Sequence, residues 1–140
     1  MPDAPLPDGP PATYEVRTVE SPHGPPAAGG YSQAVSVVGA SELLFISGQI
    51  PVDRSGAVPP DFATQCRQVW ANVLNQVTEA AMTSANLVKV TTFLADRANA
   101  DENRAIRSEI LGEHAPALTV VITGIFDEGW LLEIEAIAAR

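Results

Sequence analysis

Two glutamates near the end of the chain are the residues whose spacing first points to chemistry. They are Glu133 and Glu135, in the run LLEIEAIA at residues 131–138. Alternate side chains of a strand point to opposite faces, so both carboxylates share a face with Leu131 and Ile137. A carboxylate between aliphatic groups is typical of a pocket or a subunit boundary, where it can transfer a proton. A solvated edge strand gives the same pattern, so the glutamates alone leave both interpretations open.

Glycines mark two further points where the backbone can approach a ligand. Gly29 and Gly30 allow backbone angles that are closed to other residues, and they can hold Tyr31 in a fixed direction. Ser47 and Gly48 follow an apolar run. A glycine where a strand ends indicates either close approach of a ligand or a simple bend.

The histidines and the cysteine point to neither metal nor thiol chemistry. His23 and His114 are the two histidines of the chain, and they lack the spacing of a metal site. Cys66 falls on the apolar stripe of a predicted helix, so we interpret it as a small core residue.

Two amphipathic helices must position these residues. Residues 61–82 carry apolar side chains at helical spacing opposite a polar face. Residues 99–102 resemble a capping box that begins a second helix, and Gly112 ends it. The spacing places Arg104 and Arg107 on the exposed side of this second helix.

Apolar alternation and β-branched residues predict six strands, at residues 13–19, 35–38, 43–46, 87–94, 118–126 and 130–138. We expect two hairpins, one turning at residues 39–42 and the other at residues 127–129. If the second hairpin is tight, Glu133 and Leu118 do not face each other within it. Either a bulge then shifts the register, or a pocket joins residues of different subunits.

This order of elements predicts an α+β domain with both helices on one face of a mixed sheet. The other face has no cover, so we expect another copy of the chain to cover it in a closed assembly. The chain has 140 residues, of which 46% are apolar and 18% charged, as in one globular domain. We assign residues 13–140 to that domain. We expect residues 1–12, which hold five of the twelve prolines, to form a flexible N-terminal arm.

Charge and composition argue against two classes of partner. Eight Lys and Arg against seventeen Asp and Glu give a formal charge of −9, and no basic cluster matches a nucleic acid. No apolar run is long enough to span a membrane, and the N-terminus does not resemble a secretory signal. One cysteine excludes an internal disulfide, and we expect a cytoplasmic protein.

Four motifs, in this order, carry a family resemblance: GGYSQAV at 29–35, FISGQIP at 45–51, LVKVTTFLAD at 87–96 and LEIEAIA at 132–138. Together they resemble the RidA/YjgF family, also labelled L-PSP endoribonuclease, over residues 24–140. The resemblance implies a chorismate-mutase-like α+β fold. It also implies a homotrimer whose sheets form a central barrel, with small-molecule clefts between neighbouring subunits.

The resemblance also implies chemistry. Members of the RidA group hydrolyse enamines and imines to a keto acid and ammonia, without a metal or an organic cofactor. Glu133 matches the carboxylate that orients water or relays protons. Tyr31, Ser47, Gly48 and Asn103 match residues that line or border the cleft.

Leu118 is the main departure from the family pattern. In imine-hydrolysing members this position, after Pro-Ala, is an arginine that binds the substrate carboxylate through a charge-assisted pair. Thr119 keeps the small hydroxyl that often follows. Arg104 and Arg107 are not expected to substitute, because their spacing puts them on the solvated side of their helix. The sequence therefore predicts a substrate other than the usual α-imino acids.

The sequence leaves three functions, in order of preference. The first is an imine or enamine hydrolase of the deaminase type, and the second is a non-catalytic homotrimer that binds a small molecule against Leu118. The third, an endoribonuclease, fits poorly with a charge of −9.

Overall fold

The structure is a computed structural model that describes residues 13–140, so the arm predicted at residues 1–12 lies outside the described residues. The strands are β1 (Glu15–Val19), β2 (Ala34–Val38), β3 (Leu43–Gln49), β4 (Leu87–Leu94), β5 (Ala117–Ile122) and β6 (Leu132–Ala139). The helices are α1 (Phe62–Glu79) and α2 (Ala100–Leu111), and the short 3-10 turns are η1 (Ser84–Asn86) and η2 (Arg97–Asn99).

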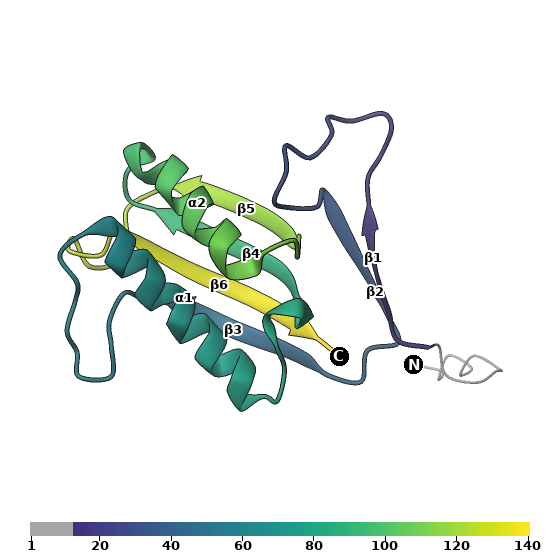
Figure 1. Cartoon of the computed structure of the whole chain (residues 1–140), viewed down its shortest axis with the longest axis horizontal. Coiled ribbons are helices and arrows are strands. Elements are labelled where there is room, and N and C mark those ends of the chain that lie inside the picture. The colour runs from purple at the N-terminus through teal and green to yellow at the C-terminus, as the bar shows by residue number, and fades with distance from the viewer. Residues whose placement is uncertain (1–12) are drawn as a thin grey trace, which may run out of the picture.

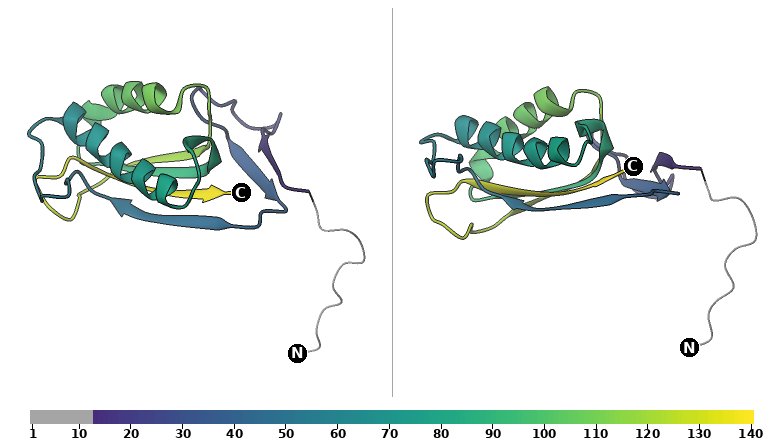
Figure 2. Two further views of the ribbon diagram at one scale, coloured as in Figure 1. Left: turned by 60° about the horizontal axis from the view of Figure 1, so that its bottom comes forward. Right: turned by 90° about the horizontal axis from the view of Figure 1, so that it is seen from below.

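Strands β3, β6, β4 and β5, in that order, form a four-stranded mixed sheet (Figure 1). Strand β6 is antiparallel to both its neighbours, whereas β4 and β5 are parallel. Leu132, Ile134 and Ala138 of β6 are fully buried, which suits a strand paired on both edges. Both helices cover the same face of this sheet, so the predicted α+β architecture is confirmed (Figure 2).

Both predicted hairpins are wrong. Strand β2 pairs with β1 in a separate two-stranded sheet, and β3 pairs with β6 instead. Strand β5 pairs with β4 and not with β6, because α2 connects β4 to β5 and a helical crossover places two strands parallel. Glu133 and Leu118 therefore lie on strands that are not neighbours, and the register of a hairpin does not relate them.

The hydrophobic core lies between the helices and the sheet. Helix α1 confirms the prediction for residues 61–82, and its apolar stripe is buried along its whole length: Phe62, Cys66, Val69, Trp70, Val73 and Val77. Asp61 begins the helix, since its carboxylate accepts a hydrogen bond from the backbone N–H of Thr64 at 3.0 Å.

Helix α2 begins differently from the prediction. Its N-cap residue, Asn99, forms no side-chain hydrogen bond, so the capping box predicted at residues 99–102 is not formed. Turn η2 leads into the helix instead, and there Asp96 accepts a hydrogen bond from the N–H of Ala98 at 2.8 Å. The predicted end is confirmed, because Gly112 follows the helix with a φ of +59° that suits glycine.

The opposite face of the four-stranded sheet carries no helix among the described residues (Figure 2). The alternation predicted for β6 is confirmed, with Glu133 and Glu135 on this uncovered face and their neighbours buried on the other. Phe45 of β3, paired with Ile137 of β6, is 70% exposed there. A large exposed aromatic side chain beside aliphatic groups is typical of a surface that another molecule covers.

Candidate functional site

Glu133 lies on the uncovered face, where its side chain rests on the backbone of β3. A Cβ atom added to Gly48 would lie 2.8 Å from Cδ of Glu133, which is closer than such atoms approach in proteins. The pairing of β3 with β6 is irregular at this point, between Ile46 and Gln49. Glycine at position 48 therefore leaves room for the half-buried carboxylate. The sequence left open whether Gly48 allows close approach of a ligand or only a bend. In the structure Gly48 allows close approach of a side chain of the same chain, that of Glu133.

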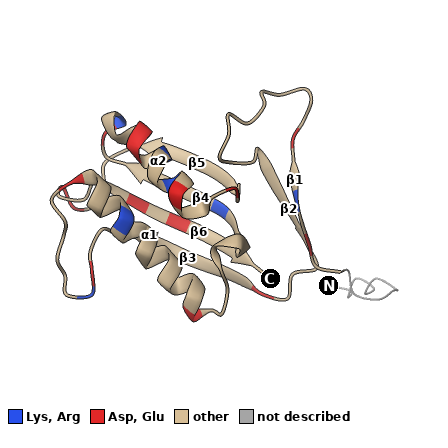
Figure 3. Ribbon diagram, in the orientation of Figure 1, with Lys and Arg blue, Asp and Glu red and all other residues tan. Residues whose placement is uncertain are grey.

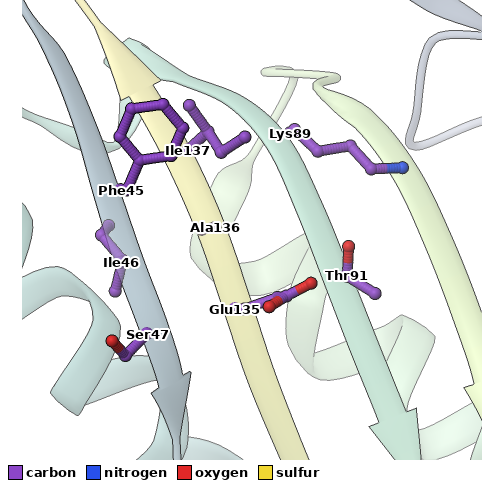
Figure 4. Close-up of a pocket in the computed structure, with 8 residues that line it drawn as sticks. All are labelled: Phe45, Ile46, Ser47, Lys89, Thr91, Glu135, Ala136 and Ile137. Carbon is purple, nitrogen blue, oxygen red and sulfur yellow. The ribbon is translucent and has the colours of Figure 1, made fainter.

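A cavity of about 260 Å³ opens on the uncovered face beside Glu135 (Figure 4). Its lining residues come from β3, β4 and β6: Phe45, Ile46, Ser47, Lys89, Thr91, Glu135, Ala136 and Ile137. The side chain of Glu135 extends toward Thr91, its partner in the β4–β6 pairing (Figure 4). The ammonium of Lys89 donates a hydrogen bond to Oγ1 of Thr119 at 2.7 Å. Thr119 therefore belongs to this face, together with Ser47.

The loop that carries Tyr31 is fixed against the start of β5. Gly29 and Gly30 have φ values of +99° and +75°, as their predicted role requires. Ser32 donates two hydrogen bonds to the chain before β5, from its N–H to the Pro116 carbonyl at 3.1 Å and from Oγ to the Ala115 carbonyl at 2.6 Å. This anchoring brings Tyr31 beside α2 and β5.

Tyr31, Asn103 and Leu118 surround a second cavity, of about 410 Å³, between this loop, α2 and the edge strand β5. We call it the edge cavity. Its other lining residues are Ala28, Gly29, Gln33, Ala100, Arg104, Arg107 and Val120. Leu118 and Val120 point to the helix side of the sheet, so the edge cavity and Thr119 lie on opposite faces.

Arg107 corrects one of the predictions. Its side chain is 5% exposed, and it lines the edge cavity next to Leu118. Arg104 is exposed, as predicted. Burial, followed by the nearby charge of Arg104, lowers the pKa of Arg107, although a guanidinium remains protonated at neutral pH. Position 107 follows Asn103 by four residues and precedes Leu111 by four, so it falls on their buried face of α2.

Asn103 is also buried, at 2% exposed, and it connects the edge cavity to the core. The thiol of Cys66 donates to its Oδ1 at 3.9 Å. Burial raises the pKa of Cys66 to about 12, which keeps the thiol protonated and unreactive at neutral pH. The interpretation of Cys66 as a core residue is confirmed.

Two further findings apply to residues 13–140. They contain no group of three or more His, Cys, Asp and Glu side chains that could hold a metal ion. Neither of the helices there is long and apolar enough to cross a lipid bilayer.

Comparison with known proteins agrees with the sheet, the helices and the motifs. The family model described as Endoribonuclease L-PSP matches residues 21–140. The chain belongs to this family, known as RidA/YjgF. A RutC family protein of Pyrococcus horikoshii is 39% identical over an alignment of 119 residues that covers 83% of this chain and 91% of that protein.

Two further relatives cover nearly the same part of the chain. The 2-iminobutanoate/2-iminopropanoate deaminase of Escherichia coli is 34% identical over 128 residues, covering 89% of this chain and 98% of its own. The crystal structure of the Rid family protein YyfB from Yersinia pestis matches with a TM-score of 0.79 at 25% identity, covering 89% and 98% of the two chains. The chain has the chorismate-mutase-like fold of the RidA family.

In this RidA-family chain the positions matched to the family cleft form two groups. Tyr31, Asn103 and Leu118 line the edge cavity, whereas Ser47, Gly48, Thr119 and Glu133 lie on the uncovered face. Acidic residues run along β6, and the basic residues of α2 lie in the helix layer on the other side of the sheet (Figure 3). One copy of the chain therefore does not bring the carboxylate of Glu133 into the edge cavity.

Proposed function

We propose that this protein is a cofactor-independent hydrolase that deaminates small imines and enamines in a cleft between neighbouring copies of the chain. The observation that carries the proposal is the Glu133 carboxylate, held against Gly48 on the uncovered face of the sheet. The 34% identity to an enzyme named 2-iminobutanoate/2-iminopropanoate deaminase supports the same reaction class.

The proposed reaction needs one proton carrier and one water. Glu133 accepts a proton from water as the water oxygen bonds to the imine carbon, and it passes this proton to the nitrogen as the C=N double bond becomes a single bond, which gives a neutral carbinolamine. The carboxylate then accepts the hydroxyl proton of the carbinolamine as the C=O bond forms. It passes this second proton to the leaving nitrogen as the C–N bond breaks, so that imine and water give a carbonyl compound and ammonia. An enamine enters the same sequence after tautomerising to the imine.

The cleft in this proposal is made by a homotrimer. The exposed Phe45 and its aliphatic neighbours support it, because an apolar sheet face is stabilised when another copy covers it. The separation of Tyr31 and Asn103 from Glu133 within one copy also supports it, since residues of two copies can then complete one cleft. We place this trimer in the cytoplasm because its one cysteine allows no internal disulfide. The charge of −9 argues against a nucleic acid or an anionic membrane surface as a partner.

A non-catalytic homotrimer that binds a small molecule is the second candidate. Leu118 favours it, because an apolar side chain stands where hydrolysing relatives are expected to have arginine. Endoribonuclease activity, which the description of the matched family model suggests, is third, because a charge of −9 repels the RNA backbone.

Ammonia release from imines generated in situ separates the first two candidates. We expect Glu133→Gln to lower turnover by about 10²- to 10⁴-fold, the usual contribution of a positioned general base. Glu135→Gln is the matched control, because it removes the same charge from the same strand two residues away. Turnover that survives in Glu133→Gln and is lost in Glu135→Gln would show that the proton carrier is Glu135 and not Glu133. An inactive wild type that still binds keto acids would favour the second candidate.

A further inference from the structure

Within residues 13–140, Arg107 is a buried cation without a counter-ion. Its side chain is 5% exposed, and its Nε–H is buried with no hydrogen-bond partner in this part of the chain. The two ion pairs found within residues 13–140 join Arg67 to Glu109 and Arg140 to Glu42, so neither involves it. A buried charge without a partner is costly, and proteins retain one chiefly where a ligand or another chain supplies the opposite charge.

The surroundings of Arg107 are built for an anion. Two of the eight basic residues, Arg104 and Arg107, line the edge cavity, and no acidic residue of the described chain does. The lining of the edge cavity is therefore positively charged, although the chain as a whole has a formal charge of −9. The terminal Nη2 of Arg107 also lies close to the glycine loop, 3.8 Å from where a Cβ atom on Gly30 would be. The guanidinium therefore extends from α2 toward Tyr31 across the cavity.

We infer that Arg107 binds the carboxylate of a small anionic ligand in the edge cavity. Arg107 of α2 thereby takes the role expected of an arginine at position 118 of β5, where this chain has Leu118. Leu118 and Val120 then form an apolar wall for the ligand's hydrocarbon part. A guanidinium presents parallel N–H groups that match the two oxygens of a carboxylate. The substrate class is thus a small carboxylate, and the exclusion of α-imino acids expected from Leu118 loses its premise. This inference names the ligand class of the site in the proposed function.

Arg107 has one competing explanation, an ion pair with a carboxylate of a neighbouring copy. That pair would make the oligomer depend on Arg107, whereas a ligand-binding arginine leaves the oligomer intact. The mass of the variants in solution therefore separates the two explanations before any ligand is added.

The first test uses the wild-type protein and no mutation. Calorimetric titration compares 2-oxobutanoate, the keto acid that 2-iminobutanoate hydrolysis gives, with 2-oxobutanamide, its neutral analogue, and with inorganic phosphate. We expect 2-oxobutanoate to bind roughly tenfold to a hundredfold more tightly than the amide, the range for one hydrogen bond to a charged group. Equal or tighter binding of the amide would overturn the inference. Tighter binding of phosphate would overturn the carboxylate assignment.

The second test moves the guanidinium. We expect Arg107→Met to weaken 2-oxobutanoate binding by about tenfold to a hundredfold and to leave amide binding nearly unchanged. Arg67→Met is the matched control, since it removes the same charge from an exposed ion pair outside the cavity. In the double variant Arg107→Met/Leu118→Arg the guanidinium projects from β5 instead, and we expect at least half of the lost binding free energy to return.

Three outcomes contradict the inference: unchanged carboxylate binding in Arg107→Met, an equal loss in Arg67→Met, or dissociation of the oligomer in Arg107→Met. These measurements are independent of turnover. Arg107-dependent binding without ammonia release would sustain the inference and overturn the proposed hydrolase. Ammonia release that does not change in Arg107→Met would support the proposed hydrolase and overturn the inference about Arg107.

Discussion

Glu133 and Gly48 act as one unit at the scale of single residues. The carboxylate occupies the space that a side chain at position 48 would take. Because the far end of a glutamate is flexible, a larger residue at 48 displaces the carboxylate rather than the strand. Position 48 therefore controls where the proposed proton carrier sits.

The substitution Gly48→Ala tests this pairing. We expect turnover to fall by about a hundredfold, because a displacement of roughly 1 Å of a catalytic group has effects of this size. The free energy of unfolding should change by less than about 1 kcal/mol, since the displaced group can rotate. Ammonia release and urea denaturation measure the two effects. In Glu133→Gln the added Gly48→Ala should cost little further activity, whereas a full additive loss would show that the two residues act separately.

Cys66 gives the protein a pH dependence of stability. Burial raises the pKa of its thiol from 9.0 to about 12, so the unfolded chain loses this proton first as the pH rises. The stabilisation is complete below pH 9 and is lost progressively between pH 9 and 12. We expect a slope of about 1.4 kcal/mol per pH unit in the difference between wild type and Cys66→Ala. Urea denaturation at pH 8 and pH 10.5 measures it, and a constant difference would contradict the burial of the thiol.

Arg107 shows how a sequence pattern can be misread at this scale. Charged residues on a helix are usually solvated, and that expectation placed both arginines of α2 on its exposed side. The spacing of Asn103, Arg107 and Leu111 contained the contrary signal, since residues four apart share one face of a helix. The burial of Leu111 could be anticipated from its apolar side chain. The burial of Asn103 and the cavity beside it could not, because the glycine loop that closes the cavity comes from far away in sequence.

At the scale of elements, local signals identified the helices and most strands but not the strand partners. The predictions for β4, α1 and the end of α2 rest on periodicity and on Gly112, which are properties of one segment. Pairing is a property of two segments. Residues 39–42 and 127–129 have the composition of hairpin turns, yet β3 pairs with β6 and not with β2, and β5 pairs with β4 and not with β6. The crossover through α2 was the usable signal for the parallel pairing of β4 and β5.

Gly112 tests the end of α2. It has a φ of +59° and a ψ of −128°, a conformation that residues with a Cβ atom rarely adopt. We expect Gly112→Ala to lower the free energy of unfolding by about 1–3 kcal/mol. Gly24→Ala is the control, because no atom lies within 4 Å of its added Cβ and its φ is not in the positive range. Equal urea midpoints for the two variants would show that strain at Gly112 does not limit stability.

At the scale of the whole molecule, the uncovered face and the edge cavity both favour an assembly of several copies of the chain. Each cavity holds only part of the residues that the sequence resemblance predicts for one cleft. The sheet also exposes Phe45 and β-strand aliphatic side chains beside two glutamates. An assembly in which copies share this face buries the apolar side chains and completes the cleft in one step. The α+β architecture of one chain was predictable from its own sequence, although the strand partners were not. The proposed cleft depends in addition on an assembly of copies, which no single segment encodes.

Phe45→Glu tests whether copies assemble through the uncovered face. Burying a phenylalanine contributes about 1.5–3 kcal/mol, and the substitution instead places a carboxylate near Glu135 in each of three copies. We expect light scattering at micromolar concentration to give three times 14.7 kDa for the wild type and the mass of a single chain for Phe45→Glu. Val58→Glu is the control, since Val58 is 43% exposed in the loop before α1 and not on the sheet. Because Glu133 and the edge cavity meet only between copies in this proposal, the dissociated variant should also lose ammonia release while keeping its fold by circular dichroism. A folded wild-type monomer that deaminates imines would place the whole reaction within one chain.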